Sequence, residues 1–493
     1  MTKSINAIIF FVLGLVNIGL YSQTLIMPNN LTFPTNNIFH NLENFSSSID
    51  TAKIKPFNLS FKIDMIKNNG HSNIDNNGNF FISGRDGYNF SARFKYSSKY
   101  LYFEIEPYVF NQNNLFDEEN SISQSYQHLN NHHILKNSGS DFGFKNSQLI
   151  VHFNGIGLGY GYINHWWSQG FHSAITLSSN APSQETFSLG TFKDIYFGSF
   201  SFSSKVILLP YKGNDNQQLY FSGLRSYLTY HSDPSISIGF NRTYLSAEMI
   251  EKDGLVNSNL KWGKLDAAKL VFEPLFGSSK KGLSYTLEGT PGFDPWDEVL
   301  SGFINLNFSN DLIIYAEVAS DDNRGNFTDL RAHWDHTLGY MLGFKKLFKI
   351  QDVKLMIGAE YLSTKESNTL NPSFYRGSPN ISNFYSKEMY DFFTYKNRFM
   401  GAHSGSSSDD LIFLVGANFN STSILLTHNS ERHGIKSRWP MELKSEISAI
   451  IKKKKSSNSF YYCHIEYEKI KNFQFINRES ISRYVWIGYA FSI

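Results

Sequence analysis

Hydrophobic and polar residues alternate with a period of two over most of the chain beyond residue 55. Within residues 99–110, Leu101 and Phe103 lie on one face of this pattern. Tyr102 and Glu104 lie on the other face. Clusters of Asn, Ser, Gly and Asp separate the alternating stretches, and helical periodicity is rare. A period of two predicts antiparallel strands that each have one apolar and one polar face.

The placement of aromatic residues favours a membrane barrel over a soluble β-sandwich. Phe, Tyr and Trp make up 16% of the chain, and a membrane barrel gathers such residues in girdles at its strand ends. The residues predicted for these girdles are Tyr100, Tyr102, Tyr227, Tyr230, Tyr461, Tyr462, Tyr484 and Trp486. The last stretch, residues 484–493, resembles the C-terminal strand that the barrel-assembly machinery of bacterial outer membranes recognises.

We therefore predict an all-β fold, a transmembrane antiparallel β-barrel over residues 56–493. A tilted membrane strand takes about 10 residues, so about 16 to 18 strands would use roughly 160 to 180 residues. The rest would form turns, loops and material inside the barrel. This range shows no repeat of fixed period and no linker, which predicts a single domain.

Two segments precede the predicted barrel. In residues 1–22, Lys3 comes before an apolar run over residues 7–16 and polar residues follow it, which is typical of a secretory signal peptide. The alternative is an uncleaved membrane anchor, but the run is short for a span and Asn17 interrupts it. Residues 23–55 have approximate helical spacing and predict a small, helical N-terminal element that is periplasmic or plugs the barrel.

Composition and charge exclude several classes of protein. Lys and Arg number 45 against 43 Asp and Glu, a net charge of +2, which predicts no nucleic-acid partner. The mean hydropathy of −0.31 is too low for a bundle of membrane-spanning helices. Cys463 is the only cysteine, so the sequence offers neither an internal disulfide nor an N-terminal cysteine for a lipid anchor.

Sequence motifs of enzymes and of cofactor sites are missing from the chain. The 15 histidines do not form the spacing of a zinc protease, and neither a nucleophile elbow nor a Walker loop occurs. The sequence therefore predicts no metal site, no cofactor and no enzymatic activity.

Residues 165–182 form the most distinctive motif of the chain. Two adjacent tryptophans are followed by a glycine and by small residues that alternate with Ile and Leu, which predicts an aromatic-rich turn leading into a strand. The motif resembles the signature of the Wzi capsule-assembly family of outer-membrane barrels. The residues shared with that signature are Trp166, Trp167, Gly170, Ser173, Leu177, Ser178, Asn180 and Ala181. The chain has Ser168 and Gln169 where the family has Gly-Pro.

Three later stretches, 224–243, 315–322 and 395–407, resemble further segments of the same family in the same order. The resemblance covers most of residues 150–420. It implies a barrel in the Gram-negative outer membrane that binds capsular or other surface polysaccharide as a lectin and helps to assemble or anchor it. Such a barrel would also contact outer-membrane lipids and lipopolysaccharide.

These motifs supply a set of candidate polysaccharide-binding residues, because aromatic side chains stack on sugar rings and polar side chains bond their hydroxyls. The candidates are Trp166, Trp167, Asn180, Tyr315, Glu317, Asp321, Tyr395 and Arg398. Each has a structural alternative. The tryptophans could be membrane anchors or packing inside the barrel, and the charged residues could be paired across the lumen.

Two other functions fit the same pattern. An outer-membrane porin or sugar channel would share the whole barrel and would have an open lumen. An outer-membrane hydrolase of lipid or glycan would need catalytic residues gathered near one mouth. The candidates for that cluster are Asp321, Asp322, His333, Asp335 and His336.

Overall fold

The computed structural model describes residues 57–71, 75–76, 78, 86–112, 139–213, 216–247, 264–271, 285–287, 290–293, 296–321, 338–365, 384–385, 388–435 and 439–493. The predicted signal peptide (1–22) and the predicted N-terminal element (23–55) lie outside the described residues. The same holds for four of the five candidates of the hydrolase alternative, namely Asp322, His333, Asp335 and His336.

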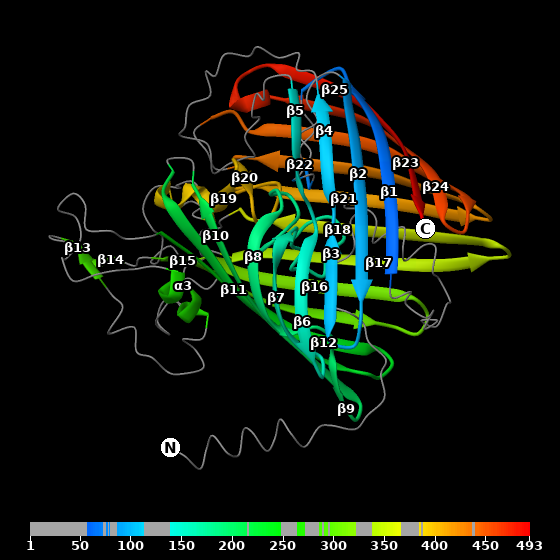
Figure 1. The fold of residues 1–493 in the computed structure, drawn as a ribbon. Helices are drawn as coiled ribbons and strands as arrows, with labels where there is room; N and C mark the ends of the chain where they lie inside the picture. The colour runs from blue at the N-terminus through cyan, green and yellow to red at the C-terminus, as the bar shows by residue number, and fades with distance from the viewer. Residues whose placement is uncertain are drawn as a thin grey trace.

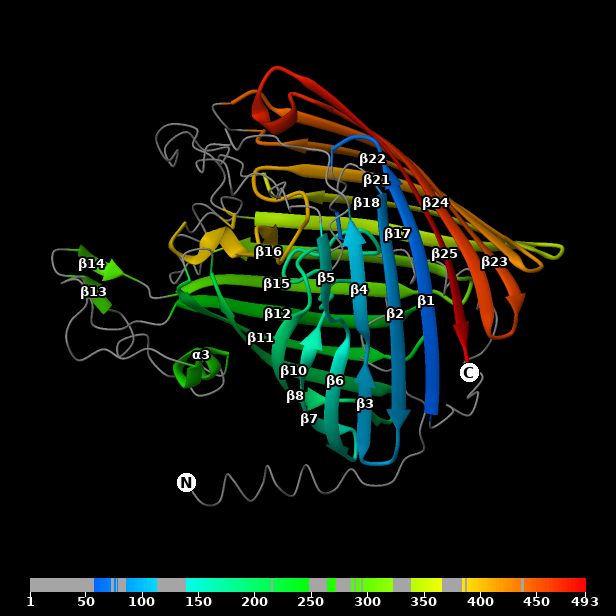
Figure 2. The ribbon, with the colours of Figure 1, turned by 45° about the horizontal axis from the view of Figure 1, so that its top comes forward.

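The main sheet is antiparallel and has 18 strand positions. It closes into a single barrel (Figure 1 and Figure 2). The last strand pairs with the first, from Ser60 opposite Ser492 to Asn68 opposite Tyr484. Closure leaves no open sheet edge, as a bilayer requires, because lipid offers no hydrogen-bond partner to free backbone groups. The predicted fold class and the predicted strand number are confirmed.

Fifteen of the 18 positions are single strands. They are β1 (Phe57–Asn68), β2 (Asp86–Ser97), β7 (Ile156–Ile163), β10 (Phe200–Lys212), β11 (Gln218–Tyr230), β12 (Ser235–Ala247), β15 (Trp296–Asn307), β16 (Leu312–Asp321), β17 (Leu338–Ile350), β18 (Val353–Ser363), β21 (Asp409–Phe419), β22 (Thr422–His433), β23 (Glu442–Ser456), β24 (Ser459–Lys471) and β25 (Glu479–Ser492). The other three positions are split strands. They are β3 (Leu101–Ile105) with β4 (Pro107–Gln112), β5 (Gly139–Phe144) with β6 (Ser147–Phe153), and β8 (Gln184–Thr191) with β9 (Ile195–Phe197).

Small elements lie between the barrel strands. They are helix α3 (Lys264–Leu270), the hairpin β13 (Tyr285–Leu287) and β14 (Thr290–Phe293), the 3₁₀ turn η4 (Glu388–Phe393), the hairpin β19 (Thr394–Tyr395) and β20 (Arg398–Phe399), and the 3₁₀ turn η5 (Phe473–Phe475). Within the described chain, each helix is too short or too polar to cross a bilayer.

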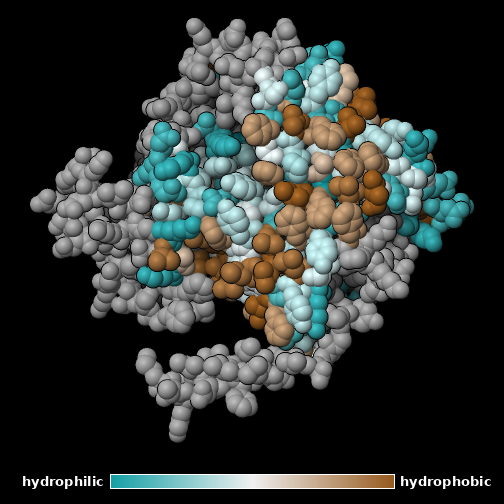
Figure 3. Space-filling model, in the orientation of Figure 1, coloured by the Kyte–Doolittle hydropathy of each residue, from teal (hydrophilic) through white to brown (hydrophobic). Residues whose placement is uncertain are grey.

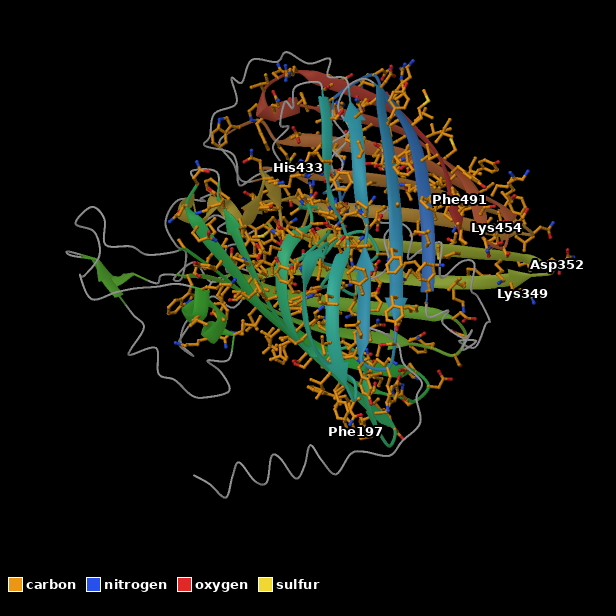
Figure 4. All side chains as sticks on the ribbon, in the orientation of Figure 1. Phe197, Lys349, Asp352, His433, Lys454 and Phe491 are labelled. Carbon is orange, nitrogen blue, oxygen red and sulfur yellow. The ribbon has the colours of Figure 1, made fainter. Side chains whose placement is uncertain are left out.

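The two ends of the barrel differ in how they connect the strands. One end has short turns, such as Asn154 and Gly155 between β6 and β7, both with positive φ (48° and 85°) as the tight hairpin turn requires. The other end carries the long connections, including 164–183 and 364–408. Figure 4 labels Phe197 and Lys349 at the short-turn end and His433 at the long-connection end. In outer-membrane barrels the short turns face the periplasm and the long loops face outside.

Side chains of the strands alternate between a lipid-like exterior and the barrel interior. In β25, Ile487 is 53% exposed, whereas its neighbour Trp486 is fully buried inside. Figure 3 shows hydrophobic side chains gathered across the outer face of the strands. The members of this outer belt include Ile63, Met65, Phe90, Val109, Leu149, Val151, Leu158, Leu189, Ile238, Val318, Leu342, Val415, Leu426, Ile447, Ile465 and Ile487.

The predicted girdles are therefore only partly right. Tyr100, Tyr230 and Tyr461 are exposed at strand ends, but a second group points into the barrel. The inward group is Tyr102, Tyr462, Tyr484 and Trp486. The physical reason is the period of two, since residues one position apart, such as Tyr461 and Tyr462, cannot face the same side of a sheet.

One hydrophobic cluster occupies the interior between β10–β12, β15–β18 and β21–β23. Two connections from the long-connection end fold inward to meet it, residues 164–183 and residues 391–408, which we call the lumenal segments. Their members in the cluster are Trp167, Phe171, Ile175, Leu177, Ala181, Phe393, Phe399, Met400 and Ala402. The interior of the barrel is thus a packed core on this side.

The outer belt gives a direct test of membrane orientation. Ile487→Lys places a charge in the middle of the exposed face of β25, where a lysine at the bilayer midplane costs about 2–4 kcal/mol. We expect the urea midpoint of unfolding in lipid vesicles to fall accordingly. The matched control is Ile350→Lys, because Ile350 is as exposed as Ile487 but lies beside a short turn. Equal losses in both variants would contradict the assignment of the belt to lipid.

Candidate functional site

The first lumenal segment enters the barrel at its two tryptophans. The backbone N–H of Trp167 donates to the carbonyl of Leu177 (2.7 Å), which folds the segment back on itself. The ring of Trp167 is buried and packs against Gly223 of β11. A Cβ at Gly223 would come within 2.8 Å of that ring, so this contact requires a glycine. Trp166 is only partly buried.

The turn after the tryptophans is held by Ser168, one of the two departures from the family signature. Its Oγ accepts the N–H of Gly170 (2.9 Å), and the indole N–H of Trp166 donates to the carbonyl of Gly170 (3.1 Å). Side chains therefore close this turn in the place where the family has Gly-Pro.

A single carboxylate on the barrel wall fixes the next residues. Glu360 of β18 accepts backbone N–H groups of Phe171 (2.7 Å), His172 (3.3 Å) and Ser173 (2.6 Å). It also accepts the hydroxyl of Tyr315 (2.6 Å). Glu360 is buried, so it stabilises the lumenal segment through four hydrogen bonds that are shielded from water.

The end of the motif joins the two lumenal segments. The side-chain amide of Asn180 donates to the carbonyl of Phe399 (2.9 Å), and its oxygen accepts the N–H of Asn76 (3.2 Å). The hydroxyl of Ser178 donates to the carbonyl of Gly401 (2.5 Å). The backbone N–H of Ser178 donates to the carbonyl of Met400 (2.6 Å). The shared motif residues Ser178 and Asn180 are therefore bonded to protein backbone.

The three candidates from β16, namely Tyr315, Glu317 and Asp321, are buried and point into the barrel. Glu317 accepts the side-chain amide of Asn241 (3.2 Å), and Asp321 accepts the N–H of Tyr385 (2.6 Å). Together with Tyr315, these residues line the wall behind the lumenal segments. The hydroxyl of Ser168 donates to Glu317 (3.4 Å), so the structure brings the motif at 165–182 and residues 315–321 together, although they lie far apart in sequence.

Tyr395 and Arg398 are cross-strand partners in the β19–β20 hairpin. Tyr395 is partly exposed and meets Tyr211 edge to face, with ring centroids 5.3 Å apart. Arg398 is buried, and its Nε and Nη2 have no hydrogen-bond partner among the described residues. Burial lowers the pKa of Arg398 to about 9, since no nearby charge offsets the loss of water.

Sequence reasoning missed a second group of charges inside the barrel. Lys444 of β23 pairs with Asp75, and its Nζ lies 2.8 Å from Glu431 and 3.2 Å from Glu468. Glu446 lies 3.6 Å from the same nitrogen. Their signal in the sequence is a short run of charges at alternate positions, Glu442, Lys444 and Glu446 in β23 and Glu466 and Glu468 in β24, which marks the polar face of these two strands.

Solved structures resemble this fold, although no protein-family model and no curated protein sequence matches the chain. One is Wzi of Escherichia coli, an outer-membrane protein involved in group 1 capsule assembly and a carbohydrate-binding β-barrel. It has a TM-score of 0.56 at 10% identity, over 87% of this chain and 83% of that one. The chain has the fold of an outer-membrane β-barrel.

Two further outer-membrane barrels match less well. OccAB4 of Acinetobacter baumannii has a TM-score of 0.43 at 9% identity, over 89% of this chain and 98% of that one. OccK3 of Pseudomonas aeruginosa has a TM-score of 0.42 at 7% identity, over 89% of this chain and 95% of that one. At this level of similarity the comparison adds nothing about function.

Proposed function

We propose that this protein lies in the Gram-negative outer membrane, binds capsular or other surface polysaccharide at its long-connection end, and helps to assemble or anchor it there. The resemblance of the 165–182 motif to the Wzi family and the carbohydrate-binding Wzi barrel among the similar folds support this proposal. The proposal assigns the protein no catalytic step.

The observation that carries the proposal is the packed interior. The lumenal segments and the wall form one hydrophobic cluster inside the barrel. A diffusion porin needs a water-filled lumen, whereas a binding protein uses the barrel as a rigid support for the groups at its mouth. We therefore favour the lectin over the porin or sugar channel.

The eight candidate binding residues differ in their exposure to solvent. Six are buried, and most of these bond to protein atoms inside the barrel. These six are Trp167, Asn180, Tyr315, Glu317, Asp321 and Arg398. Trp166 and Tyr395 are only partly buried, and stacking on a sugar requires an accessible ring. We propose that these two rings contact the glycan, that the guanidinium of Arg398 bonds it beside Tyr395, and that the other five buried residues hold the lumenal segments in place.

Binding of the organism's own surface polysaccharide to the detergent-folded protein tests this proposal. Trp166→Ala and Tyr395→Ala should each weaken binding about tenfold, which corresponds to about 1.4 kcal/mol. The control is Tyr100→Ala, because Tyr100 is an exposed ring at the short-turn end and should not contact the glycan. Equal affinity of all three variants and of the wild type would place the glycan elsewhere.

Arg398→Met separates a binding role from a structural one. Removing a buried guanidinium that has unsatisfied donors should leave the unfolding midpoint unchanged or raise it. The same variant should lose glycan affinity if the charge serves binding.

Conductance of the wild-type protein in a planar bilayer tests the channel alternative. A large, constant conductance without glycan binding would favour the channel instead.

A further inference from the structure

Four potential metal ligands from four separate parts of the chain meet inside the barrel. They are His172 of the first lumenal segment, His403 of the second, Asp410 of β21 and Glu431 of β22. Each offers one ligand atom, and these atoms all lie within 4.8 Å of one another. His403, Asp410 and Glu431 are buried, and His172 is partly buried.

The distances within this group fit a shared ion better than direct hydrogen bonds. Oδ2 of Asp410 lies 3.3 Å from Nε2 of His172 and 3.3 Å from Nε2 of His403. A charge-assisted N–H···O bond normally measures about 2.7–2.9 Å. Ligands of a tetrahedral ion held at about 2.0–2.1 Å are about 3.3–3.4 Å apart. Glu431 borders the group, with its Oε1 3.7 Å from Nε2 of His403 and 2.8 Å from the ammonium of Lys444.

Asp410 supplies a second, independent observation. It is 2% exposed, and its Oδ1 has no hydrogen-bond partner among the described residues. A buried carboxylate with an oxygen that lacks a donor is costly, and a cation bound at the same carboxylate offsets part of that cost. Ser173 donates to Oδ2 of Asp410 (2.9 Å), which orients the carboxylate toward the two imidazoles, as outer partners of metal ligands commonly do.

A second group of carboxylates in the barrel is already neutralised by a lysine side chain. Asp75, Glu446 and Glu468 also lie close enough to hold an ion. There the ammonium of Lys444 already lies among them. That cluster therefore carries no metal site.

We propose that His172, His403 and Asp410 bind one divalent transition-metal ion of the zinc class. Glu431 is not counted among the ligands, because its Oε1 already lies 2.8 Å from the ammonium of Lys444. Imidazole nitrogens combined with carboxylate oxygens are ligands that Zn²⁺ favours. The ion ties both lumenal segments to wall strand β21. Trp166 and Tyr395, the residues proposed for glycan binding, are not among its ligands. The site is independent of the proposed polysaccharide function.

The test uses the full chain folded in detergent, stripped with a chelator and then titrated with Zn²⁺. We expect one equivalent of zinc per chain, measured by metal analysis after desalting. Asp410→Asn and His403→Gln should each weaken zinc binding by about 100-fold or more. The control is His165→Gln, which alters a buried histidine of the first lumenal segment. His165 is bonded to Thr186 (2.9 Å) and lies outside the cluster.

A spectroscopic measurement keeps the proposal falsifiable if a variant does not fold. Co²⁺ added to the wild-type protein should give the intense visible bands of a four-coordinate site with nitrogen ligands, and Zn²⁺ should abolish them. Folded wild-type protein that retains no zinc overturns the proposal. Retention of zinc by folded Asp410→Asn at wild-type affinity overturns it as well.

Discussion

Replacing Glu360 with alanine should release the first lumenal segment and lower the free energy of unfolding by about 4 kcal/mol or more. The variant removes the acceptor of three backbone N–H groups and of the Tyr315 hydroxyl, and each buried donor left unsatisfied costs about 1–3 kcal/mol. The midpoint of urea unfolding, followed by tryptophan fluorescence, measures the loss. Limited proteolysis should also cleave residues 164–183 in the variant and spare them in the wild type.

Two milder variants provide the controls for Glu360→Ala. Tyr315→Phe removes one of the four hydrogen bonds and should cost about 1 kcal/mol. Glu360→Gln keeps one acceptor oxygen and should fall between the two. If Glu360→Ala unfolds at the wild-type midpoint and its lumenal segment resists protease, this carboxylate does not hold the segment.

Lys444→Met should destabilise the barrel by about 3–5 kcal/mol, the usual cost of removing one partner from a buried ion pair. Lys444 is 5% exposed and lies among Asp75, Glu431, Glu446 and Glu468. Without it the carboxylates repel one another in a region of low dielectric constant. The change in urea midpoint relative to the wild type is the measurement.

An exposed ion pair of equal length serves as the comparison for Lys444. Lys469 and Glu479 pair at 2.8 Å between β24 and β25, and both side chains are more than a third exposed. Lys469→Met should cost less than about 1 kcal/mol. Adding Glu468→Gln to Lys444→Met should recover part of the lost stability, because it removes one of the repelling charges. Similar losses in the two lysine variants would show that burial does not strengthen the Lys444 group.

The barrel could be predicted from the sequence because the alternation of apolar and polar residues is visible within each strand. The alternation at Val485 and Ile487 against Tyr484 and Trp486 sets the two faces of β25 without knowledge of any other strand. The same local rule shows why the girdle prediction was partly wrong. Composition near a strand end locates aromatic residues along the barrel axis, but only the parity of the position decides between lipid and interior.

The candidate site could be predicted only in part, because its geometry depends on contacts across the barrel. The motif residues Trp167 and Asn180 are recognisable by the resemblance of their segment to the Wzi signature. Their partners Glu360 and Phe399 lie far along the chain, and no local pattern connects them to the motif. Whether a tryptophan is buried or exposed inside a barrel is decided by such partners, so sequence alone could not rank Trp166 above Trp167.

The contacts of the first lumenal segment also constrain the order of folding. Ser173 meets Glu360, 187 residues later in the chain, and Ser178 meets Gly401 at a separation of 223 residues. Contacts between residues so far apart in the sequence form slowly, because a long loop must close before they are made. The tryptophan-rich segment therefore stays without its partners until the C-terminal half of the chain has arrived and been inserted. During that interval its apolar side chains are exposed, and exposed apolar surface in a partly folded chain favours aggregation.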